Sequence, residues 1–144
     1  MTTTAALIGR ELGPLRRTLL GRTRIAADLP DLSEAQIELL RTLAAEGPLA
    51  PSELAAALRL ARSTVSNLLR TLTAAGFVER RAGANQRTVV VTVSARAAGA
   101  LERYDAAAEA LLGAALDRLA PAERAALAAA APVLARLTGA LDAG

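Results

Sequence analysis

Hydrogen-bonding side chains and arginines occur together in residues 62–72. Serine, threonine and asparagine side chains both donate and accept hydrogen bonds, and each arginine carries a fixed positive charge. Short polar side chains suit the base edges of the major groove of duplex DNA, and long cations suit phosphates. The residues with this chemistry are Arg62, Ser63, Thr64, Ser66, Asn67 and Arg70. The alternative is an ordinary amphipathic helix whose polar face meets only water, because helix caps rich in Ser and Thr look similar.

A helix is the element that would position these side chains. Val65, Leu69 and Leu72 recur at helical spacing and predict one apolar stripe facing a core, with the polar residues on the other side. Pro51 suits the first position of a shorter preceding helix, which we expect to end at Leu58. Two helices joined by so short a connection predict a helix-turn-helix.

After Gly76 the periodicity changes from helical to alternating. Phe77 and Val78 begin one predicted strand, and residues 88–93 form a β-branched run that predicts a second. Residues 80–87 lie between them as a loop of glycine, alanine and asparagine flanked by arginines. A hairpin directly after a helix-turn-helix is a wing, whose arginines can follow the DNA backbone or enter the minor groove. The alternative is a plain exposed hairpin. The candidate wing residues are Arg80, Arg81, Asn85 and Arg87.

Positive charge is concentrated in this part of the chain. Residues 59–96 hold seven arginines and one acid, a balance of +6, whereas the whole chain is +3. Such a patch is the electrostatic footprint of nucleic-acid binding, because a duplex presents a dense row of phosphates. All 17 basic residues are arginine, and alanine is abundant, as in a GC-rich bacterial genome. Part of the arginine content therefore reflects codon usage.

The chain contains neither cysteine nor histidine. Thiol redox chemistry, disulfides and thiolate metal sites are thus excluded, and the commonest general base is missing. We expect no enzymatic activity, metal or cofactor, since the acids Glu102, Asp105 and Glu109 have the helical spacing of solvated charge. The apolar run 125–135 is shorter than the roughly 20 residues of a membrane span. Without a signal peptide pattern, the expected location is the cytoplasm.

Further helices are predicted before and after this region. Residues 5–27 form one, which Gly13-Pro14 should kink or restart, and Ser33 with Gln36 fits a capping box that begins another. Two more follow, one over 95–119 capped by Ser94, and a single kinked one from Pro121 past Pro132. In the final helix Leu127, Leu134 and Leu141 repeat at seven-residue intervals, the spacing of helices that pack along each other. Because these alanine-rich helices bury little area each, we expect a dimer interface.

The predicted fold is therefore mainly α with a small β-hairpin wing, a winged helix-turn-helix between terminal dimerisation helices. We expect a single structural domain with three parts: an N-terminal dimerisation helix in 1–30, the DNA-binding region in 31–94 and C-terminal dimerisation helices in 95–144.

The order of these elements resembles the MarR family of bacterial transcription regulators, and the resemblance covers nearly the whole chain. Its most specific part is the succession of residues 52–55 (SELA), residues 62–66 (RSTVS), Leu72, residues 76–80 (GFVER) and the wing. Each fragment is weak alone, but their order and spacing together are specific.

The resemblance implies a sequence-specific DNA-binding regulator, acting as a homodimer on a pseudo-palindromic operator. Family members are commonly repressors released by small, often aromatic or phenolic ligands bound between the dimerisation helices and the DNA-binding lobe. Arg16, Arg17 and Tyr104 are the candidate residues for such a ligand pocket.

Three residues depart from the family's pattern. Asn85 stands two positions before the wing arginine, where an acid is usual; Arg59 stands where a glycine is frequent in the turn; Ala61 replaces the usual capping serine or threonine. A missing cap weakens the start of a helix by about 1 kcal/mol.

From the residues we expect Ser63, Ser66 and Asn67 to contact base edges, with Asn67 able to contact adenine. Arg62 and Arg70 would hold phosphates, so their loss should weaken all sequences alike. Arg87 would occupy the minor groove, with Arg80 or Arg81 beside it. The rival hypothesis is a winged-helix dimer that acts through protein contacts without specific DNA binding.

Overall fold

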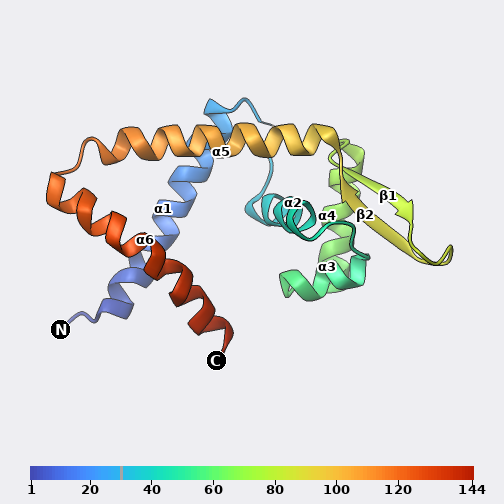
Figure 1. Ribbon diagram of the computed structural model, residues 1–144, viewed down its shortest axis with the longest axis horizontal. Helices are drawn as coiled ribbons and strands as arrows, with labels where there is room; N and C mark the ends of the chain where they lie inside the picture. The colour runs from blue at the N-terminus through green and yellow to red at the C-terminus, as the bar shows by residue number, and fades with distance from the viewer. Residues whose placement is uncertain (30) are drawn as a thin grey trace. The chain divides into compact units, whose positions relative to one another are not determined.

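The computed structural model describes residues 1–29 and 31–144, which form two compact units, Met1–Ala108 and Glu109–Gly144. Helices in the first unit lead to a two-stranded antiparallel hairpin, and the next helix, α5, begins in the first unit and ends in the second (Figure 1). The elements are α1 (Thr4–Ala26), α2 (Glu34–Glu46), α3 (Pro51–Leu58), α4 (Arg62–Ala74), β1 (Val78–Ala82), β2 (Val89–Val93), α5 (Ala95–Leu116) and α6 (Pro121–Asp142). This confirms the predicted fold class.

Helix α2 begins and ends as its sequence predicts. Ser33 Oγ accepts a hydrogen bond from the Gln36 amide at 3.2 Å, and Gln36 Oε1 accepts one from the Ser33 amide at 2.8 Å. Two amides that the helix leaves without a backbone partner are thereby bonded, which confirms the capping box. Gly47 ends the helix with a φ of +76°, a conformation in which glycine has no Cβ to clash.

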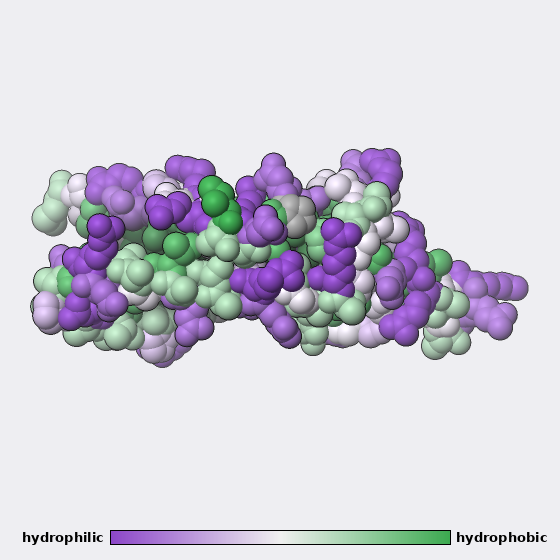
Figure 2. Space-filling model, turned by 90° about the horizontal axis from the view of Figure 1, so that it is seen from above, coloured by the Kyte–Doolittle hydropathy of each residue, from purple (hydrophilic) through white to green (hydrophobic). Residues whose placement is uncertain are grey.

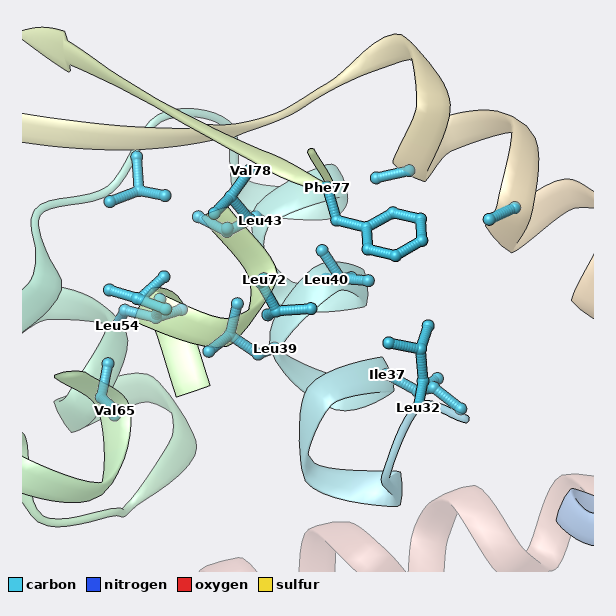
Figure 3. Close-up of a cluster of buried hydrophobic side chains, with 14 of the residues drawn as sticks. Leu32, Ile37, Leu39, Leu40, Leu43, Leu54, Val65, Leu72, Phe77 and Val78 are labelled. Atoms are coloured by element: carbon cyan, nitrogen blue, oxygen red, sulfur yellow. The ribbon is translucent and has the colours of Figure 1, made fainter. Parts of the chain in front are cut away.

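In the core of the first unit, apolar side chains from several elements pack together around α2 (Figure 3). Val65, Leu69 and Leu72 of α4 are buried, which confirms the predicted stripe. The Phe77 ring points toward the start of α5, where Ala97 and Ala100 are also buried. Burying such a side chain contributes about 1.5–3 kcal/mol to the free energy of folding. The stripe therefore determines which face of α4 turns toward the core.

The hairpin is longer on its first side than predicted. Val78 pairs with Val93 and Ala82 with Val89, so Arg80 and Arg81 lie in β1 and not in the loop expected for 80–87. The valine-rich partner strand offers backbone hydrogen bonds to whichever residues face it, and these bonds outweigh the weak strand preference of the segment. Leu49 extends the pairing on the other edge of β2, with bonds of 3.2 and 2.7 Å to Val91.

The proline-containing helices continue through their prolines. Helix α1 does not restart at Pro14, and α6 passes Pro132 as a single helix, which confirms that prediction for α6. Helix α5 ends at Leu116, three residues before the expected end, and α6 begins at Pro121. A proline disfavours helical conformation in the residue before it, so a break ahead of Pro121 is expected.

Helix α6 has no buried residue in this structure. Leu127, Leu134 and Leu141, at seven-residue intervals, are 50%, 50% and 74% exposed. By length and composition alone, α6 is also apolar enough to cross a membrane. The sequence prediction considered only the apolar run 125–135, which lies between two arginines. The structure has one continuous helix from Pro121 to Asp142, which is longer than that run. An apolar helix of this kind must be covered by another apolar surface.

Candidate nucleic-acid interface

In the turn between α3 and α4, Arg59 adopts a left-handed backbone conformation, which is strained for any residue with a Cβ. Arg59 has φ +55° and ψ +41°, and the Leu60 amide donates to the Ala55 carbonyl at 3.0 Å. This bond closes the end of α3 as a glycine at position 59 would. Arginine makes the same turn with its Cβ near the carbonyl oxygen, at a cost of about 1–2 kcal/mol. The helix-turn-helix therefore forms without the usual glycine.

Helix α4 presents its polar side chains outward. Arg62, Ser63, Thr64, Ser66, Asn67 and Arg70 are all exposed. Ala61 is the N-cap residue and supplies no side-chain hydrogen bond to the first turn. The predicted polar face is therefore accessible, and the amides at its start are open to an external acceptor.

Two residues of this face are joined to each other. Nη2 of Arg70 donates a hydrogen bond of 2.6 Å to Oδ1 of Asn67, one helical turn away. Sequence reasoning assigned these residues separate tasks, a phosphate contact and a base contact. Their spacing of three residues was the signal that could have connected them, since such positions are neighbours on a helix.

The wing comprises β1, β2 and the intervening residues 83–88, and hydrogen bonds order its tip. Asn85 Oδ1 accepts from the Arg87 amide at 3.1 Å, and the Asn85 carbonyl accepts from the Thr88 amide at 2.9 Å. A Cβ at Gly83 would lie 2.5 Å from Oγ1 of Thr88, so a larger residue there would displace the Thr88 hydroxyl from its bond to the Asn85 carbonyl. Asn85 thus binds the backbone of Arg87 and not its guanidinium. Figure 2 shows the wing, at its right-hand end, as hydrophilic.

Ser94 connects the end of α4 to the start of α5. Its hydroxyl donates to the Gly76 carbonyl at 2.6 Å and accepts from the Ala97 amide at 3.1 Å, so it is the predicted cap and also ties down the turn after α4. Arg96, which sequence reasoning did not single out, places its guanidinium 5.0 Å from the centre of the Phe77 ring. A further cation therefore lies at the base of the wing.

Two of the three predicted ligand residues, Arg16 and Tyr104, line a small hollow between α1, α2 and the first part of α5. The hollow measures about 140 Å³, and Leu19, Leu20, Ile37, Arg16 and Tyr104 are among its lining residues. Arg17, the third predicted residue, does not line it. Its Nη1 lies instead 3.3 Å from where a Cβ of Gly13 would be, one turn back along α1.

The arginines of this hollow already have carboxylate partners. Arg16 forms an ion pair with Glu34, and Arg41 forms one with Asp105. Arg41 also lies 5.3 Å above the centre of the Tyr104 ring. The hydrogen bond that Arg41 donates to Asp105 raises the pKa of Arg41 above its ordinary value, despite the opposing effect of desolvation. An anionic ligand would have to compete with these carboxylates.

A helix-turn-helix followed by an arginine-bearing hairpin defines the winged helix-turn-helix class of DNA-binding proteins. The model of the MarR family matches residues 32–89, from two residues before α2 to the first residue of β2. A protein from Pseudomonas aeruginosa, described as a transcriptional regulator, is 34% identical over 95% of this chain and 99% of its own, with a TM-score of 0.74. The chain belongs to the MarR family.

More distant solved structures share the fold. MepR from Staphylococcus aureus, a transcription regulator of the multidrug efflux pump MepA, is 20% identical over 96% of this chain and 98% of its own, with a TM-score of 0.75. A MarR family protein from Bacillus stearothermophilus is also 20% identical, over 94% of this chain and 96% of its own, with a TM-score of 0.73. No curated protein sequence matches the chain. Membership of the family makes the chain a DNA-binding transcriptional regulator.

Proposed function

We propose that this protein is a ligand-responsive repressor that binds a pseudo-palindromic operator as a homodimer. The observation that carries the proposal is the polar and basic face of α4, fully exposed beside a buried apolar stripe. Such a helix can enter the major groove, while the wing follows the duplex to the minor groove. Residues 31–94 would then bind DNA, and residues 1–30 and 95–144 would form the dimer.

The proposed contacts follow from side-chain chemistry. Ser63, Ser66 and Asn67 contact base edges, with Thr64 beside them, and Arg62 holds a phosphate. Arg87 enters the minor groove from the tip of the wing, where Asn85 holds its backbone amide. Neither Arg62 nor Arg87 has a carboxylate partner in the described part of the chain, so both are available to phosphates.

The dimer is proposed from exposed apolar side chains in both units. On α1, Leu7, Leu12 and Leu15 are 41%, 40% and 57% exposed, and α6 exposes its whole leucine series. A second copy of the chain would cover these leucines. Burial at such an interface favours a cytoplasmic protein over a membrane-anchored one. Sedimentation of the purified protein without detergent would test this, with a soluble dimer as the expected result.

The proposed effector is a small aromatic or phenolic molecule in the hollow beside Arg16 and Tyr104. It would act by binding one spacing of the two DNA-binding lobes better than another. Thermal shift with a panel of phenols and aromatic acids should show stabilisation that Tyr104→Leu removes. The absence of both stabilisation and any change in DNA affinity across the panel would refute this class of effector.

Fluorescence anisotropy on duplexes tiled across the protein's own upstream region tests the function as a whole. We expect one tight, two-fold-symmetric site well above random duplex, and a steep loss of affinity with salt. Asn67→Ala should lower the preference for that site by about 1–3 kcal/mol. Weak binding to every duplex, lost at modest salt, would instead support the rival function, a winged-helix dimer that acts through protein contacts.

A further inference from the structure

A hollow of about 410 Å³ lies between α4 and β1, at the edge of the polar face of α4. Its lining residues are Ser66, Arg70, Thr73, Ala74 and Arg80. Two arginines and a serine therefore border one solvent-open space, and none of its lining residues is acidic. Neither arginine has a carboxylate partner in the described residues. Such a combination suits a singly charged oxyanion.

The register of the hairpin selects Arg80 for this hollow. Consecutive residues of a strand point to opposite faces, so Arg80 shares a face with the buried Val78 and points toward α4. Arg81 shares the other face with Glu79, the one acid among residues 59–96. The two neighbouring arginines, equivalent in sequence, thus differ in their electrostatic surroundings and in what they can reach.

Arg70 belongs both to the hollow and to the base-contacting face. One of its five N–H donors bonds Oδ1 of Asn67 at 2.6 Å, and the others stay available. A guanidinium is planar and rigid, so a group bound on one side fixes its orientation on the other. A ligand in the hollow would therefore also hold Asn67 in place.

We propose that this hollow binds one phosphate of the DNA backbone, held by Arg70 and Arg80, and that Arg70 at the same time positions the Asn67 amide for its base contact. The inference rests on the proposed DNA binding by α4 and goes beyond it. Arg70 then helps to determine sequence specificity. From its residue type alone, we expect only a phosphate contact, which is the same for every DNA sequence. Arg80 contacts the same DNA phosphate that Arg70 of α4 holds, and it does not enter the minor groove.

Neutral phosphate analogues locate the phosphate. Operator duplexes carrying one methylphosphonate per half-site, scanned along both strands, are titrated with the full-length protein by anisotropy. At one position, neutralisation should weaken wild-type binding about tenfold, the loss of a charged hydrogen bond. Arg70→Ala and Arg80→Ala should each lose this sensitivity at that position, whereas the matched control Arg81→Ala keeps it. If Arg80→Ala kept the full wild-type sensitivity at every position, the phosphate site would be refuted.

Base-substituted operators test the positioning role. Asn67→Ala and Arg70→Ala should each reduce discrimination at the same base pair about tenfold, and the double variant should lose no more than either alone. Arg80→Ala should lower affinity without changing discrimination. Equal weakening of all duplexes by Arg70→Ala, with discrimination lost only in Asn67→Ala, would show that Arg70 does not position Asn67.

The outcomes separate this inference from the proposed function. Wild-type protein that binds operator and random duplexes alike would overturn the proposed function, and this inference with it. Specific wild-type binding with an unaltered methylphosphonate profile in the variants would overturn the inference alone. All substituted residues are exposed, and circular dichroism of each variant verifies its fold.

Discussion

The guanidinium of Arg41, on α2, donates two hydrogen bonds to the carboxylate of Asp105, on α5, across 64 residues of sequence. The same guanidinium covers the Tyr104 ring. Helix α2 lies in the proposed DNA-binding region, and α5 follows that region in the chain. This contact therefore connects the proposed DNA-binding region to a proposed dimerisation helix.

The Arg41–Asp105 tie should contribute a small but measurable coupling to stability. Both side chains are partly exposed, at 36% and 58%, so we expect a coupling of about 0.2–1 kcal/mol in a double-mutant cycle of Arg41→Ala and Asp105→Ala. Arg41→Ala should cost more than Asp105→Ala, since it also loses the contact with Tyr104. Denaturant unfolding at one protein concentration measures this, and 1 M salt should diminish the coupling. Strict additivity of the two substitutions would contradict it.

Arg59→Gly should stabilise the protein by about 0.5–1 kcal/mol in denaturant unfolding. Glycine adopts the left-handed conformation of this turn without strain, and the gain exceeds the extra freedom of the unfolded chain. Asp28→Gly is the matched control, because Asp28 also has a positive φ of 51° but aspartate tolerates it better. The control should gain less. A loss of stability in Arg59→Gly would show that the contacts of this arginine outweigh its backbone strain.

Ala61→Ser should stabilise the start of α4 by about 1 kcal/mol. Ala61 already has the extended backbone of an N-cap, with φ −64° and ψ 146°, and lacks only the side-chain acceptor. Ala56→Ser, in the exposed interior of α3, is the control and should destabilise slightly. Native-state hydrogen exchange of the first α4 amides would locate the effect. Unchanged protection there would mean that serine does not cap the helix.

Ser94→Ala should destabilise the protein by about 1–3 kcal/mol. The substitution removes the buried hydroxyl of Ser94, which is the donor to the Gly76 carbonyl and the acceptor of the Ala97 amide. Ser94→Thr keeps the hydroxyl and should recover most of the stability. Thermal and denaturant unfolding of the three proteins measure this. If alanine and threonine were equally destabilising, the effect would come from packing and not from the hydrogen bonds.

Several features of this protein were determined by local sequence. The Ser33–Gln36 capping box, the proline at the start of α3 and the apolar stripe of α4 depend on residues within one or two turns, and all agree with the structure. The β-branched run likewise forms a strand. Periodicity and capping are local properties, so the order of elements follows from them, and so does the polar face of α4 that stays exposed.

Other features depended on contacts between distant segments. Only pairing with β2 shows that Arg80 and Arg81 lie in a strand and face opposite ways. Only the packed structure gives Arg16 a partner in Glu34 and directs Arg17 away from the same hollow. Residue type defines what a side chain can bind, but its partner depends on which elements pack together. That packing results from burial of the whole core, which no short stretch of sequence encodes.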